Sequence, residues 1–175
     1  CWKAAGHGAQ TTAQALGNSC NIAFGHIGVQ LGGTRFYEYA KDFGVMERTG
    51  VDLPGESKGY FFGLDVLSQG YASVISGAFG QTFRVTPIQQ ARAIAAVVNG
   101  GYVLEPYIVS QVLDADGNVV LENGRTVLRQ AISESTSITM RDLMEKVVTE
   151  GTAKGAKTPG YRVGGKTRSE ERRVG

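Results

Sequence analysis

The segment Thr86–Gly101 reads TPIQQARAIAAVVNGG and carries the clearest helix signals in the chain. Pro87 stands at a first-turn position, where its fixed φ and missing N–H are tolerated. Apolar side chains then recur on one helical face before two glycines stop the pattern, at Ile88, Ala91, Ala95 and Val98. The segment therefore predicts an amphipathic helix in the middle of the chain.

A β-hairpin is predicted directly after this helix. Residues 107–122 read YIVSQVLDADGNVVLE, which is two extended apolar runs on either side of the turn pair Asp116-Gly117. Helix and antiparallel hairpin therefore follow one another in one domain.

Three further helices and one long connection are predicted before and after this helix and hairpin. Helical apolar spacing occurs at Cys20, Phe24, Ile27 and Leu31, then at Phe36, Tyr39 and Phe43, and finally at Met140, Leu143, Met144, Val147 and Val148, ahead of Gly151. Residues 44–63 are rich in glycine and contain Pro54, which predicts a long surface connection.

The composition indicates one globular domain. The chain has 175 residues, of which 42% are hydrophobic and 19% charged, and its net charge is +2. The basic residues are scattered, which argues against a nucleic-acid partner. The longest apolar candidate, ARAIAAVVNG, is too short to span a bilayer, so we expect a soluble piece. Because the chain opens abruptly at CWKAAGHG, we interpret it as part of a longer protein.

The letters of residues 160–167, GYRVGGKT, match a phosphate-binding P-loop, but their surroundings do not. A P-loop needs an apolar strand before its first glycine and a helix starting at its Lys-Thr. Polar, turn-like residues precede Gly160, and no apolar helical face follows Thr167. Nucleotide binding is therefore disfavoured, and the alternation of Tyr161 and Val163 indicates a short strand.

The last eight residues, RSEERRVG at 168–175, stand apart from the rest. A nucleotide string whose translation is RSEERRVG resembles an adapter oligonucleotide of short-read sequencing. We therefore expect two segments, a domain at 1–167 and a non-native tail at 168–175. The alternative is an ordinary solvated, charged tail.

Two short motifs remain, Ser19-Cys20-Asn21 and GGKT at 164–167. In this order, with the flanks CWKAAGHG, TGVDLPGE, FGQTFRVTPIQ and VVNGGYVLEPYIV, they resemble the transpeptidase domain of class B penicillin-binding proteins across residues 1–167. The resemblance implies an α/β fold of the penicillin-binding protein and serine β-lactamase type, with an antiparallel sheet flanked by helices, here incomplete.

Three motifs meet in one cleft in that family: Ser-x-x-Lys with the nucleophile, Ser-x-Asn, and Lys-Thr-Gly on a strand. The second matches Ser19 and Asn21, and the third begins at Lys166-Thr167 but has Arg168 in its glycine position. No Ser-x-x-Lys precedes Ser19, and GESKG at 55–59 has the wrong spacing. We therefore expect this fragment to be inactive alone, although its parent is an enzyme.

The residue types of these motifs suit acyl transfer. Ser19 can relay a proton, and Lys166 can act as a second cation that lowers the pKa of the nucleophile's lysine. Asn21 can pair with a substrate peptide group, while Thr167 and Lys166 can hold a terminal carboxylate. By resemblance the substrate is the D-Ala-D-Ala end of a peptidoglycan stem peptide, β-lactams mimic it, and no cofactor is needed.

The other chemically capable residues receive structural interpretations, with one exception. His26 has no carboxylate or cysteine at a suitable spacing and is interpreted as packed structure, and His7, between two glycines, is interpreted as shaping a loop. DLPGE at Asp52–Glu56 is typical of a turn, so no metal site is predicted. The exception is a hypothesis that Cys1 and Cys20 form a redox-sensitive disulfide that would displace Ser19 and Asn21.

The resemblance also implies a place in the cell. The parent would be held by an N-terminal transmembrane helix, absent here, on the extracytoplasmic face of the bacterial membrane, where it would act with cell-wall synthesis partners in division or sporulation. Two alternatives stay open: a serine β-lactamase, and a non-catalytic penicillin-binding sensor or scaffold domain.

Overall fold

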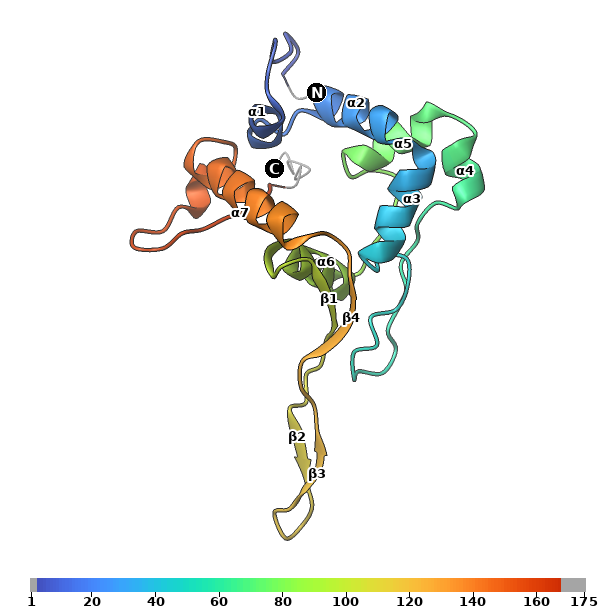
Figure 1. Ribbon diagram of the computed structural model, residues 1–175, viewed down its shortest axis with the longest axis vertical. Coiled ribbons are helices and arrows are strands. Elements are labelled where there is room, and N and C mark those ends of the chain that lie inside the picture. Colours follow the sequence, from blue (N-terminus) through green and yellow to red (C-terminus); the bar gives the residue numbers. More distant parts are fainter. Residues whose placement is uncertain (1–2, 168–175) are drawn as a thin grey trace, which may run out of the picture.

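The computed structural model describes residues 3–167, in which a run of helices is followed by the strands of two small antiparallel sheets and then by a further long helix (Figure 1). In chain order the elements are α1 (Thr12–Gly17), α2 (Asn21–Leu31), α3 (Gly33–Asp42), α4 (Leu64–Ser68), α5 (Tyr71–Ala78), α6 (Pro87–Val98), β1 (Tyr102–Glu105), β2 (Gln111–Leu113), β3 (Val119–Glu122), β4 (Thr126–Gln130), α7 (Glu134–Thr149) and the 3-10 turn η1 (Lys154–Ala156).

The central helix predicted from TPIQQARAIAAVVNGG is confirmed as α6. Thr86 is its N-cap, and Pro87 lies in its first turn. The Gln89 side chain accepts a hydrogen bond from the Thr86 N–H at 2.8 Å, while the Thr86 hydroxyl accepts one from the Gln89 N–H at 3.3 Å. This reciprocal capping box satisfies donors that a helix start leaves open, so the helix begins where the sequence indicated.

The other three predicted helices are also confirmed, as α2, α3 and α7. Helix α7 begins at Glu134, ahead of the apolar repeat that starts at Met140, because the Ser133 hydroxyl accepts the Thr136 N–H and caps the helix early. The predicted connection at 44–63 contains no helix or extended strand. The short helices α1, α4 and α5 were missed, since five to eight residues carry too little periodicity.

The strands form two antiparallel ribbons. β1 pairs with β4, with Tyr102 opposite Gln130, and β2 pairs with β3, with Gln111 opposite Glu122. The second ribbon confirms the predicted hairpin, and it extends away from the helices as an arm (Figure 1). The expected α/β class, with antiparallel strands and flanking helices, is therefore confirmed.

The strand predicted around Tyr161 and Val163 is wrong. Neither ribbon includes this segment, and residues 162–167 have no regular secondary structure. The Gly165 N–H instead donates to the carbonyl of Met144 on α7 at 3.1 Å. A strand needs a neighbouring ladder for its backbone groups, and the local alternation of side chains cannot supply one.

Helix α6 also holds the long connection through two buried polar side chains, Gln89 and Arg92, which we call the α6 clamp. Gln89 Nε2 donates to the carbonyls of Glu47 at 2.6 Å and Lys58 at 3.0 Å. Arg92 Nη2 donates to the carbonyl of Gly44 at 2.5 Å. These bonds fix the connection against the helix without a regular element of its own.

The apolar core is small and lies where α3, α4 and α5 meet. Phe62, Leu67 and Val74 are buried there, with Phe36 and Phe61 packed against them. A second buried group lines the contact of α6, β1 and α7, at Ala96, Val103, Val147 and Val148. Of the helices within residues 3–167, none has the length and apolar character needed to cross a membrane.

Candidate active site

The two residues expected to be catalytic meet in the structure. Lys166 Nζ donates a hydrogen bond of 2.7 Å to Ser19 Oγ, although 147 positions separate the residues in the chain. Local sequence pattern cannot produce a contact over that separation. The fold around α1, α2 and α7 must therefore hold both side chains.

Ser19 lies in the tight link between α1 and α2. Its backbone has φ +50°, in the left-handed region that residues other than glycine rarely adopt. Hydrogen bonds on both sides hold this conformation: the Ser19 N–H donates to the Leu16 carbonyl at 3.2 Å, and the Cys20 N–H donates to the Ala15 carbonyl at 3.0 Å. Strained backbone of this kind costs about 1–3 kcal/mol and concentrates at functional sites.

Lys166 follows two glycines that run along α7. The hydrogen bond from the Gly165 N–H to Met144 fixes the backbone one residue before it. Lys166 Nζ also donates to the Thr167 carbonyl at 3.0 Å and lies 3.4 Å from Thr167 Oγ1. Protein atoms packed around the ammonium take water from it, and this desolvation lowers the pKa of Lys166. The acceptors around Nζ compensate part of that cost.

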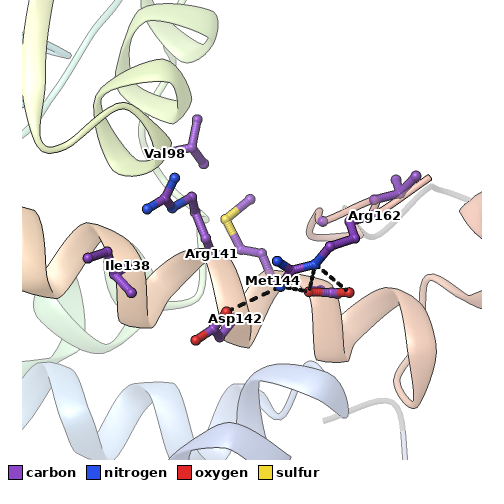
Figure 2. A pocket seen from close by; sticks show the side chains of 9 residues that line it. Val98, Ile138, Arg141, Asp142, Met144 and Arg162 are labelled. Carbon is purple, nitrogen blue, oxygen red and sulfur yellow. Dashed lines mark hydrogen bonds and ion pairs between the residues drawn. The ribbon is translucent and has the colours of Figure 1, made fainter.

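A second contact holds the same segment to α7 (Figure 2). Arg162 donates to the carboxylate of Glu145, with a distance of 3.0 Å from Nε, and its guanidinium lies 3.5 Å from Asp142. This pairing lowers the pKa of Glu145. The contact borders a pocket of about 440 Å³ between the end of α6, the middle of α7 and residues 162–164, whose lining includes Gly164 but neither Ser19 nor Lys166. This pocket is therefore beside the site and not at it.

The two halves of the site are joined by a close glycine contact between the ends of α1 and α7. The Thr152 N–H donates to the Gly17 carbonyl at 3.0 Å. A Cβ placed on Gly151 would lie 2.7 Å from the Gly17 oxygen, so only glycine fits there. We call this contact the Gly17–Gly151 joint. From the sequence, Gly151 was predicted only to end a helix, and nothing in the sequence pattern indicated a role for its partner Gly17.

The expected substrate-binding residues flank this pair. Thr167 Oγ1 lies 2.8 Å from Thr152 Oγ1, so Thr167 is linked by hydrogen bonds both to Lys166 and to the end of α7. Asn21 is the first residue of α2, half-buried, and it follows Ser19 by two positions. The structure thus brings Ser19, Lys166 and Thr167 into one hydrogen-bonded group and places Asn21 beside it along the chain.

The cysteine hypothesis is only partly within the described residues. Cys20 is buried and is the N-cap residue of α2. Burial raises the pKa of its thiol, but backbone hydrogen bonds at Ala23 and Ile22 and the Gln10 side chain outweigh this effect and lower the pKa overall. Cys1 lies outside the described residues, so its pairing with Cys20 stays a prediction. Within residues 3–167 no three metal-ligating side chains come together.

Comparison with known proteins identifies the class. The sequence model of the penicillin binding protein transpeptidase domain matches residues 1–172. The chain belongs to this family, which confirms the resemblance drawn from Ser19-Cys20-Asn21 and GGKT. The match extends past residue 167 into the segment expected to be a non-native tail.

Individual relatives agree with this assignment. The chain is 44% identical over 168 residues to stage V sporulation protein D of Bacillus subtilis, covering 95% of this chain and 26% of the relative. The D,D-transpeptidase domain of a peptidoglycan glycosyltransferase from Eggerthella lenta superposes with a TM-score of 0.82 at 27% identity, covering 94% of this chain and 43% of that one.

A third neighbour was solved with a β-lactam. Penicillin-binding protein 3 of Mycobacterium tuberculosis in complex with ampicillin has a TM-score of 0.73 at 29% identity, over 88% of this chain and 32% of that one. The chain spans about a quarter of the length of the sporulation protein.

Proposed function

We propose that the parent of this chain is a serine-type peptidoglycan D,D-transpeptidase that also binds penicillin. The observation that carries the proposal is the 2.7 Å hydrogen bond between Lys166 and Ser19, in a chain of the transpeptidase family. The names of the neighbours support it, since one is a D,D-transpeptidase domain and another was solved with ampicillin.

In the proposed reaction the nucleophile is another serine, from a Ser-x-x-Lys motif that this chain lacks. Ser19 and Lys166 take part in the proton transfers that accompany its attack on the substrate. A bond forms between that serine's oxygen and the penultimate D-Ala carbonyl carbon, and the C–N bond to the terminal D-Ala breaks. Ser19 can accept and donate in turn, so it passes the serine's proton towards the leaving amine. An acceptor amine from a neighbouring stem peptide then takes the acyl group and releases the serine.

The remaining site residues bind the substrate in this proposal. Thr167 and the Lys166 ammonium hold the terminal carboxylate of D-Ala-D-Ala, because a hydroxyl and a cation are the natural partners of that group. Asn21 pairs with a peptide group of the stem through its planar amide. A β-lactam, which has both a carboxylate and an amide, would occupy the same contacts.

The test uses the full-length parent protein, expressed from its native gene. Incubation with a fluorescent penicillin should give a stable covalent product, and peptide mapping should place the label on the serine of a Ser-x-x-Lys motif. Ser19→Ala should slow labelling by about 10²-fold or more, within the range of a lost proton-transfer group. Ser57→Ala, in the exposed connection, is the matched control and should label as the wild type does.

The alternatives give different outcomes. A label that forms and is then rapidly hydrolysed indicates a serine β-lactamase, because that class activates water against the acyl group. A protein that binds penicillin without covalent labelling is a sensor or scaffold domain. Either result would overturn the transpeptidase proposal.

We further propose that residues 1–167 are part of a transpeptidase domain, that residues 168–175 are not native, and that the parent is anchored in the membrane with this domain on the extracytoplasmic side. Long-read sequencing of the locus tests the boundary: glycine should follow Lys166-Thr167 in the native gene. Arginine at position 168 in the locus would show that the tail is genuine.

The orientation in the membrane is tested separately, by asking whether a protease added to intact protoplasts cleaves this domain.

A further inference from the structure

Thr152 connects the two halves of the site, although no motif includes it. Its backbone N–H donates to the carbonyl of Gly17, two residues before Ser19, at 3.0 Å. Its hydroxyl lies 2.8 Å from the hydroxyl of Thr167. One residue therefore contacts both the Ser19 link and the segment after Lys166.

The backbone around Thr152 is fixed from both directions. The Gly151 N–H donates to the Lys146 carbonyl and the Ala153 N–H to the Val147 carbonyl, both at 3.1 Å, which ties this turn to the end of α7. The Gly17–Gly151 joint packs directly before it. The Thr152 hydroxyl is thus presented from a rigid position, which a positioning group requires.

Either hydroxyl of the Thr152–Thr167 pair can be the donor, and counting donors and acceptors around Thr167 shows what one direction would leave free. A hydroxyl has one hydrogen to donate and two lone pairs to accept with. The Lys166 ammonium, 3.4 Å from Thr167 Oγ1, can only donate, so it occupies one lone pair. If Thr152 donates into the other, the Thr167 hydrogen is left to point away from both neighbours, towards an incoming anion.

We propose that Thr152 is a positioning residue, which donates to Thr167 and so directs the Thr167 hydrogen at the carboxylate of the substrate. This inference rests on the proposed function, because it assigns Thr167 the binding of that carboxylate. Thr152 itself need not touch the substrate. Its effect should therefore be confined to ligands that carry the anionic group.

The experiment measures the second-order rate constant of acylation of the full-length parent by a penicillin and by the uncharged amide of the same penicillin. Thr152→Val keeps the shape and removes the donor; it should lower the rate with the carboxylate about fivefold to tenfold, as the loss of one hydrogen bond predicts, and leave the rate with the amide unchanged. Thr152→Ser restores the hydroxyl and should recover most of the rate.

Two controls separate positioning from a structural role. Thr149→Val removes a hydroxyl from the same end of α7, where it bonds only the Glu145 carbonyl, and should change neither rate. In a double-mutant cycle, Thr152→Val should have no further effect once Thr167→Val has removed its target. Thr152→Ala serves the same comparisons should the valine variant lose its cooperative thermal unfolding.

The outcomes distinguish this inference from the proposed function. Equal loss with penicillin and its amide, or a Thr152→Val effect that persists in the Thr167→Val background, overturns the role of Thr152. So does a Thr152→Val protein that acylates as the wild type does. Absence of covalent labelling in the wild type overturns the proposed function, and the present inference with it.

Discussion

The α6 clamp and the Ser19–Lys166 contact both join distant parts of the chain, but they do so in opposite ways. In the clamp, buried Gln89 and Arg92 are surrounded by backbone carbonyls from the 44–63 connection. At the site, one hydrogen bond joins two side chains, one of them on backbone at φ +50°. The clamp directs its hydrogen bonds to the connection, whereas under the proposed function part of the hydrogen-bonding capacity of the site serves a ligand.

This difference separates the residues that are expected to stabilise the domain from those that are expected to take part in the reaction. A buried polar group without its partner costs about 1–3 kcal/mol, so the hydrogen bonds from Gln89 and from the Arg92 Nη atoms to the connection are structural. Among the described residues, Arg92 Nε has no hydrogen-bond partner. By contrast, a strained serine beside a lysine of lowered pKa is the arrangement that the proposed proton transfer needs. Changes in the clamp should therefore affect unfolding, and changes at the site should affect acylation.

The largest expected effect is at Lys166. Lys166→Met in the full-length parent removes the cation beside Ser19 and should slow acylation by penicillin about 10³-fold, in the range of a lost acid-base group. The melting temperature should change little, since the hydrogen bonds that Lys166 Nζ donates, to Ser19 and to Thr167, are exposed. Lys157→Met, in the exposed turn after η1, is the control. Acylation within tenfold of the wild type would contradict the assigned role.

The next effect is at the clamp. Gln89→Leu leaves the carbonyls of Glu47 and Lys58 without their donor and should lower the free energy of unfolding by about 3 kcal/mol. Urea unfolding of the complete transpeptidase domain measures it. Gln90→Leu, exposed on the same helix, should stay within about 0.5 kcal/mol of the wild type. Similar losses for both variants would remove the contrast between clamp and surface.

A smaller loss of stability is expected at the Gly17–Gly151 joint, together with slower acylation. Gly151→Ala places a Cβ 2.7 Å from the Gly17 oxygen and 2.9 Å from the Val147 oxygen, so α1 and α7 must separate. The cost should be about 2 kcal/mol of stability, and acylation should slow as well because Ser19 moves with α1. Gly155→Ala has open space around its Cβ and is the control. Unchanged acylation would show that the joint does not position Ser19.

The smallest expected effect is in the way that stability and the acylation rate depend on pH. Desolvation lowers the pKa of Lys166 in the folded protein, so its ammonium loses its proton below the ordinary lysine value. The folded state then binds fewer protons than the unfolded state, and stability rises with pH between the two pKa values. Acylation that needs the cation should fall as pH rises through the lowered pKa.

Lys166→Arg tests this point, because a guanidinium keeps its charge through the whole range. Its acylation should be slower at neutral pH but lack the alkaline fall. The pH profile of the second-order rate constant, measured from pH 6 to about 10.4, the ordinary lysine value, decides the matter. An identical alkaline fall in both proteins would assign it to another group.

The sequence predicted Ser19, Asn21, Lys166 and Thr167 as candidate site residues, but it did not show how the fold holds them. Ser19 and Lys166 were found because Ser-x-Asn and GGKT, with their long flanks, resemble one family, and not from periodicity. The left-handed backbone of Ser19, the Gly17–Gly151 joint and the Thr152 hydroxyl were missed. The joint brings together opposite ends of the chain and Thr152 reaches a residue 15 positions further on, and a single sequence does not show which of these residues touch. The backbone of Ser19 is held by the nearby carbonyls of Leu16 and Ala15, in a link too short to carry a periodic signal.

By itself the sequence determined the elements whose signals are local. Thr86 and Pro87 define the start of α6, the Asp-Gly turn defines the hairpin, and apolar spacing gives the body of α7, because caps, turns and helical faces act within a few residues. The tertiary structure alone decided that Tyr161 and Val163 lie outside any strand and that Lys166 contacts Ser19. The pairing of a strand with a distant partner and a side-chain contact across 147 positions arise only when the tertiary fold brings distant segments together.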